Sequence, residues 1–156
     1  LAARAFLLEQ GELAPVLARH GWRLVPQALT YFARWRPKHA HMRVFDTRFY
    51  LADLGTGAVE LAVDATENTH LFWASAAQAL QLADAKQIGV IFPTRRNLER
   101  LAQFATFAET KAHAEALPVR MVTPFMSERD GQRWLLIPEG HGYPVQGEPL
   151  DSVERG

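Results

Sequence analysis

Two adjacent arginines, Arg95 and Arg96, are the residues whose type and position best suit phosphate chemistry. They follow Thr94, a fair N-cap, and are therefore expected in the first turn of a helix. Cations are unfavourable there, because the helix macrodipole favours acids in the first turn by about 0.3 to 1 kcal/mol each. Glu99 lies within helical pairing distance of both arginines and could compensate them. The alternative is that the arginines and the free backbone N–H groups of the helix start present a cationic surface to a phosphate.

A second charged pair lies in the aromatic-rich stretch of residues 42–54. Side chains alternate along a strand, so Asp46 and Arg48 should share one face, and Phe45, Phe49 and Leu51 the other. Such a pair is most often a structural ion pair or a charge on the rim of a sheet. The alternative is a substrate-facing role.

The other polar candidates are isolated. His39 and His41, in the short basic loop of residues 36–41, could bind a metal or a phosphate, but metal sites need at least three ligands and no third is visible nearby. A solvated loop is the simpler interpretation. Glu67 is a single acid before an expected strand, which is usual for a turn residue. The sequence contains no cysteine, which excludes disulfides, thiolate zinc sites and cysteine nucleophiles.

Charge and length narrow the class of protein further. Lys plus Arg and Asp plus Glu number 17 each, so no overall basic field attracts nucleic acid or an anionic membrane surface. No apolar run approaches the roughly 20 residues of a membrane helix, and no signal peptide is evident. We expect a soluble, cytoplasmic protein. The chain begins with Leu1 inside an expected helix, which suggests a fragment or a processed chain.

The pattern of elements that must position these residues predicts an α+β domain with a mixed or antiparallel sheet. Helices are expected over residues 1–9, 12–20, 76–82 and 94–116, the third capped by Ser75 and Gln78. Strands are expected over 29–35 and 42–54 as an antiparallel hairpin, and over 59–63 and 69–73. Strands at 119–125 and 132–137 flank an Asp130-Gly131 hairpin turn. We assign residues 1–138 to one domain and 139–156 to an extended surface tail.

The sequence has no glycine-rich phosphate loop, no Gly-x-Ser-x-Gly elbow and no His-Glu-x-x-His. Three of its stretches are nevertheless distinctive: VFDTRFYLA at residues 44–52, WASAAQAL at 73–80 and FPTRRNL at 92–98, with Glu67 between the first two. In this order and spacing they resemble the C-terminal half of Nudix hydrolases, in the branch of the coenzyme A diphosphatases. The resemblance covers nearly all of the chain. It implies a partial Nudix α/β/α sandwich with a C-terminal β-hairpin.

The resemblance implies a hydrolase that cleaves a pyrophosphate linkage in a nucleoside diphosphate joined to another moiety, with Mg²⁺ or Mn²⁺ as cofactor. The family's metal ligands come from the carboxylates of the Nudix box, Arg-Glu-x-x-Glu-Glu, which occurs nowhere in this chain. Hard cations need such clustered oxygens, so the chain should be catalytically incomplete on its own and hold no metal site.

The resemblance also suggests roles for individual residues. Glu67 falls where some Nudix enzymes place an additional metal ligand or base. Lys38, Arg43, Arg95 and Arg96 become candidates for binding substrate phosphates. The alternative to a hydrolase is a non-catalytic module that binds a nucleotide or coenzyme A, or another protein. A homodimer that completes the sheet is a further expectation.

Overall fold

The computed structural model describes residues 2–38, 44–55 and 71–153. The expected strand at 59–63 and the start of that at 69–73 lie outside the described residues. So do His39, His41, Arg43 and Glu67. Residues 71–73 are the described part of the strand expected at 69–73, and they do not form a strand.

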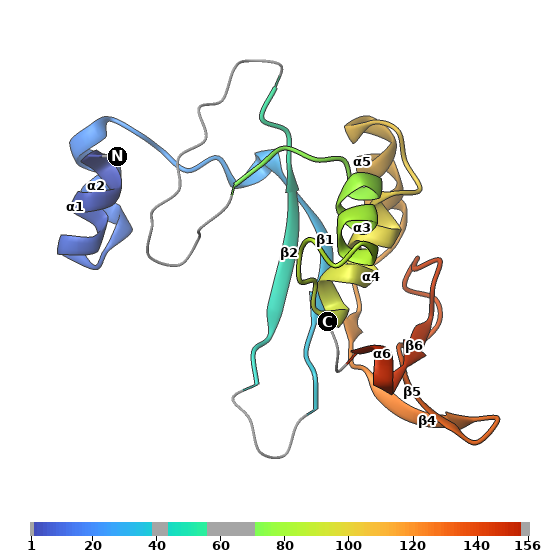
Figure 1. Cartoon of the computed structure of the whole chain (residues 1–156). Coiled ribbons are helices and arrows are strands. Elements are labelled where there is room, and N and C mark those ends of the chain that lie inside the picture. Colours follow the sequence, from blue (N-terminus) through green and yellow to red (C-terminus); the bar gives the residue numbers. More distant parts are fainter. Residues whose placement is uncertain (1, 39–43, 56–70, 154–156) are drawn as a thin grey trace.

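The two expected N-terminal helices are confirmed. Helix α1 spans Ala2–Gln10 and α2 spans Leu13–His20. Gly21 ends α2 in the left-handed conformation, with φ of 63°, which glycine adopts without steric penalty. The two helices contact each other and lie apart from the sheet (Figure 1). No described helix has the length and apolarity needed to cross a membrane.

The central sheet is mixed and has the strand order β2-β1-β3. A short 3₁₀ turn, η1 (Pro26–Ala28), leads into β1 (Leu29–Trp35), which pairs antiparallel with β2 (Thr47–Ala52). This confirms the expected hairpin. The third strand, β3 (Met121–Val122), runs parallel to β1 on its other side. Because β2 lies at the edge of the sheet, the FDTR stretch has a strand neighbour on one side only among the described residues.

The predicted alternation of faces is confirmed within β2 but not for Phe45, which precedes the strand and is 61% exposed. Phe49 and Leu51 pack against the buried core. On the opposite face Tyr31 stacks on Tyr50, with ring centroids 5.1 Å apart. In Figure 1 the helices α3, α4 and α5 all lie on one side of this sheet. Among the described residues the Tyr50 side of the hairpin is open, with Tyr50 49% exposed.

The single long helix expected after Thr94 is instead two helices. Helix α4 spans Phe92–Leu101 and α5 spans Phe107–Ala116. The break follows from a capping box: Thr106 Oγ1 accepts the Glu109 N–H at 3.2 Å, and Glu109 Oε2 accepts the Thr106 N–H at 3.2 Å. This Thr-x-x-Glu signature outweighed the apolar stripe that continued past it. Upstream, α3 (Ala76–Asp84) begins with the predicted box of Ser75 and Gln78.

The C-terminal ribbon is confirmed, with different strand limits. Strand β4 (Phe125–Arg129) pairs with β5 (Gln132–Leu136) through a two-residue turn. Asp130 and Gly131 have φ of 51° and 75°, as a type I′ turn requires. The expected strand at 119–125 is too early in the sequence. Because the turn has only two residues, residues 127–129 pair with β5 and belong to the strand. Met121 and Val122 pair in the other sheet.

The segment expected to be an extended tail is folded. Strand β6 (Gly147–Pro149) adds to β5, and helix α6 (Leu150–Val153) follows it. Tyr143 is buried, with 6% of its surface exposed. Its hydroxyl accepts the Trp35 indole N–H at 2.9 Å and donates to Asn97 Oδ1 at 2.9 Å. This residue therefore joins the C-terminal segment to β1 and α4.

Candidate functional site

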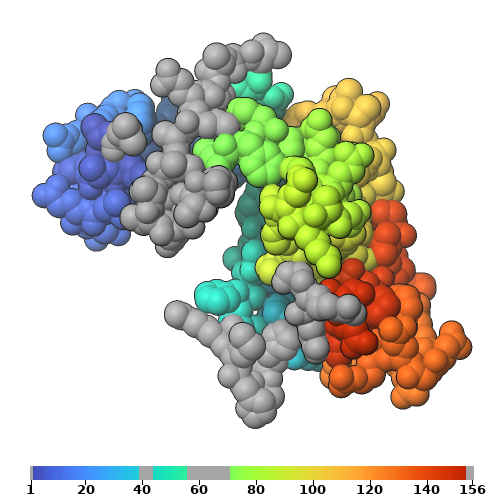
Figure 2. Space-filling view, viewed as in Figure 1, coloured from blue at the N-terminus to red at the C-terminus, as the bar shows by residue number. Residues whose placement is uncertain are grey.

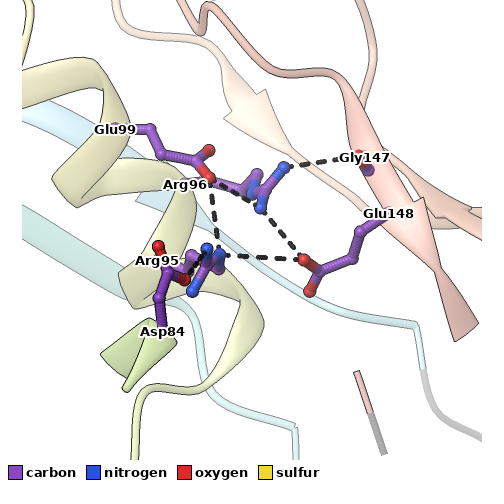
Figure 3. A network of polar contacts seen from close by, with 6 residues as sticks. All are labelled: Asp84, Arg95, Arg96, Glu99, Gly147 and Glu148. Atoms are coloured by element: carbon purple, nitrogen blue, oxygen red, sulfur yellow. Dashed lines mark hydrogen bonds and ion pairs between the residues drawn. The ribbon is translucent and has the colours of Figure 1, made fainter. Parts of the chain in front are cut away.

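A network of five charged side chains lies where the end of α3, the start of α4 and β6 meet. Figure 3 shows Arg95 and Arg96 at the start of α4, with three carboxylates around them. The guanidinium of Arg96 donates to Glu99 Oε1 at 2.9 Å and to Glu148 Oε2 at 3.2 Å. It also reaches the backbone carbonyl of Gly147 at 3.4 Å. One arginine thus ties β6 to α4.

Arg96 is almost completely buried, with a side chain 2% exposed. Burial lowers its pKa from the usual value, and the two nearby carboxylates oppose that effect. Burial also raises the pKa of Glu99, against the attraction of Arg96 and Arg95. Both groups therefore carry a desolvation cost that their contacts with oppositely charged neighbours offset. Arg96 has no access to a substrate phosphate in this arrangement. Of the two roles that the sequence allowed, Arg96 therefore has the structural one, pairing with Glu99.

Arg95 is placed differently. Its side chain is 26% exposed and contacts Asp84 at the end of α3, with Nη2 to Oδ1 at 2.6 Å. This hydrogen bond is the main cause that raises the pKa of Arg95. Glu99 and Glu148 lie further away, at 3.5 and 3.8 Å from its Nε. The compensation expected from Glu99 alone is thus shared by three carboxylates from three elements.

A groove of about 510 Å³ opens beside this network. Asp84, Arg95 and Glu148 line it together with Lys86 from the loop after α3. Two cations and two anions face the space, so its charges balance. A polyanion would bind in this groove only if Arg95 released the carboxylates that it now contacts.

The remaining predicted site residues are not brought together. Lys38 is exposed just beyond the end of β1. Glu67 and Arg43 lie outside the described residues, so their predicted roles stay predictions. Of the candidates for binding phosphate, only Arg95 lines a described groove.

Asp46, the residue before β2, and Arg48 on β2 belong to a cluster that also includes β1. The Asp46 carboxylate accepts from Arg34 on β1 through both oxygens, at 2.8 and 2.6 Å, whereas Arg48 is 3.9 Å away. The hydrogen bond from Arg34 holds the pKa of Asp46 below its usual value. Arg34 and Arg48 are opposite each other in the ladder, and like charges there are destabilising. Asp46 therefore neutralises a cross-strand repulsion, with a partner that sequence spacing did not reveal.

Sequence reasoning missed a second buried cation, Arg100. Its Nη1 donates to the Phe32 carbonyl at 2.9 Å, and its guanidinium lies 4.2 Å from the centroid of the Phe32 ring. Its Nε donates to His113 Nε2 at 3.3 Å, which requires an unprotonated nitrogen. Burial lowers the pKa of Arg100, and burial together with Arg100 lowers that of His113. No sequence signal marks Arg100, because its partners are far apart in the chain.

The described residues do not fit a magnesium site. They contain no group of three or more His, Cys, Asp or Glu side chains able to hold a metal ion. The three acids around Arg95 and Arg96, Asp84, Glu99 and Glu148, are all engaged by these arginines.

Comparison of this chain with protein-family models, with curated proteins and with solved structures found no match. The interpretation of this region therefore depends on its geometry alone. Its features are the buried Arg96 with its two carboxylate partners, the charge-balanced groove and, among the described residues, an open face of a mixed sheet.

Proposed function

We propose that this chain is the substrate-side part of a Nudix-type hydrolase, which cleaves the pyrophosphate linkage of a nucleoside diphosphate joined to another moiety such as coenzyme A. The proposal starts from the three motif stretches and their order. It includes a cytoplasmic setting, and Mg²⁺ or Mn²⁺ held by carboxylates that this sequence lacks.

The observation that carries the proposal is the one-sided mixed sheet. Helices α4 and α5 cover one face, where the Trp35 and Phe92 rings meet edge to face at 6.1 Å. The other face presents the Tyr31–Tyr50 stack and the cluster around Asp46. A mixed sheet between two helical layers is the architecture that the family resemblance implies, and here one layer is present among the described residues. The open face is where a helix bearing the catalytic carboxylates would fit.

In this proposal Arg95 and Arg96 have different roles. Arg95, partly exposed at the groove, remains a candidate for the substrate phosphates, and so does the exposed Lys38. Arg96 holds β6 against α4 and does not touch substrate. Glu67 and Arg43 keep the roles suggested by the resemblance.

The proposal is tested by hydrolysis assays with coenzyme A, ADP-ribose and NADH in the presence of Mg²⁺. They should be run on this chain and on a longer version that includes in-frame coding sequence upstream of Leu1. We expect turnover only in the longer version. An inactive longer version that contains a carboxylate-rich helix would refute the proposal.

The second candidate function is a non-catalytic module that binds a nucleotide, coenzyme A or another protein. It is favoured by the engagement of Asp84, Glu99 and Glu148 with arginines. Calorimetry separates the two: metal-independent binding without turnover in either version favours the module. Light scattering tests whether the open edge strand β2 pairs two chains into a homodimer.

A further inference from the structure

An aromatic hollow lies between the segment before α3 and the surface of that helix. Phe72, Trp73 and Ala74 form one wall, and Gln78, Gln81 and Leu82 of α3 form the other. The space measures about 330 Å³, at the lower end of small-molecule sites. In Figure 2 this segment, light green, forms part of the visible surface.

The two rings of this wall have no aromatic or cationic partner among the described residues. Trp73 is 64% exposed and Phe72 is 49% exposed. The other tryptophans are all engaged: Trp22 stacks on His20, Trp35 contacts Phe92 and Tyr143, and Trp134 meets the guanidinium of Arg129. An exposed, unused indole beside a second ring is a platform on which a planar ring can stack.

The facing helix adds hydrogen-bonding groups at the correct spacing. Gln78 and Gln81 are three residues apart and therefore lie on one face of α3. The Gln78 carbonyl accepts the Ser75 N–H at 2.9 Å, which fixes that side chain and leaves its amide donors available. The side chain of Gln81 makes no hydrogen bond to another described residue, so both its donor and its acceptor are free. A glutamine amide can pair with the adjacent donor and acceptor of an adenine edge.

We propose that this hollow binds the planar nitrogen heterocycle of a nucleoside, with Trp73 and Phe72 stacking on the ring and Gln81 reading its edge. An aliphatic occupant would use the rings but leave the amides unsatisfied. The heterocycle uses both. The inference rests on the proposed function for its ligand class, a nucleoside diphosphate derivative, and adds the part of the substrate that the protein recognises.

Calorimetric titration of the 156-residue chain with adenosine tests the site. Adenosine contains no phosphoanhydride, so its binding is independent of hydrolysis. We expect binding of adenosine but not of ribose. Trp73→Ala should weaken adenosine binding about 5- to 150-fold, the loss expected for one stacking ring, whereas Trp73→Phe should retain most of the affinity. Gln81→Ala should weaken adenosine more than purine riboside, which lacks the exocyclic amine.

The matched control is Trp22→Ala, because Trp22 is exposed to a similar degree, 58%, but lies outside the hollow. It should leave adenosine affinity unchanged. No binding of adenosine at millimolar concentration, or equal affinities for the Trp73→Ala and wild-type chains, would overturn the site. A longer version that hydrolyses no pyrophosphate while adenosine binding depends on Trp73 would remove the proposed function and leave the site standing.

Discussion

Replacing Arg96 with methionine should unfold the protein far more readily than the same change at Arg95. Methionine resembles the aliphatic stem of arginine but has no guanidinium group, so the charge and its hydrogen bonds are removed. The Glu99 and Glu148 carboxylates, with 14% and 19% of their side chains exposed, then lose their closest cation. Breaking a buried pair by removing one partner costs about 3 to 5 kcal/mol. Since Arg95 still lies within 4 Å of both acids, we expect the lower end, about 3 kcal/mol.

The matched control is Arg95→Met. The main partner of Arg95 is Asp84, whose side chain is 62% exposed, and such pairs contribute at most about 1 kcal/mol. Urea denaturation should thus separate two adjacent arginines by about 2 kcal/mol. In thermal melts the Arg96 variant should lose about 6 to 12 °C.

The pH dependence gives a second readout. The pKa of Glu99 is raised by burial, so its ionisation lowers the stability of the fold as the pH rises from the usual value of 4.5 through the folded value. Arg96 opposes this cost. The deficit of Arg96→Met should be largest at neutral pH and shrink below pH 4.5, where Glu99 is protonated. Equal losses for the two arginine variants, or a pH-independent deficit, would refute the assignment of Arg96 as the structural clamp.

Three further perturbations test other contacts. Tyr143→Phe removes a hydroxyl that bridges a buried indole and a buried amide, and should cost about 1 to 3 kcal/mol in urea denaturation; no loss would mean that the C-terminal segment is not part of the core. The folded pKa of His113 is depressed, so stability should fall as the pH drops below 6.5 towards that lower value, and His113→Gln should flatten this dependence. If the variant kept the same slope of stability against pH, the titration of His113 would not be the cause of that slope. Asp46→Asn leaves Arg34 opposite Arg48, and should lower the melting temperature more than it alters ligand affinity; a larger effect in calorimetry than in the melt would indicate substrate contact instead.

Local chemistry explains what could be predicted from the sequence. The α+β class, the β1–β2 hairpin, the Ser75 capping box and the Asp130-Gly131 turn each depend on residues a few positions apart. Capping and turn geometry are short-range effects, which a sequence displays directly. Thr106 and Glu109 also mark the break before α5, but the apolar stripe that continues across it favours a single helix.

The contacts that could not be predicted join distant parts of the chain. Arg96 and Glu148 are 52 positions apart, and Trp35 and Tyr143 are 108 apart. A Gly- and Pro-rich segment without periodicity indicates an extended tail, yet one buried tyrosine fixes it to the sheet. The candidate site was therefore only partly foreseen: the sequence drew attention to Arg95 and Arg96 but could not show that one of them is buried.

The central prediction is that hydrolysis requires carboxylates that this chain lacks. The direct measurement is Mg²⁺-dependent hydrolysis of ADP-ribose, coenzyme A and NADH, compared between this chain and the longer version that includes upstream coding sequence. We predict that the chain alone releases no product and that the longer version cleaves at least one of these pyrophosphates. Turnover by the chain alone, or none by a longer version that contains a carboxylate-rich helix, would contradict the account.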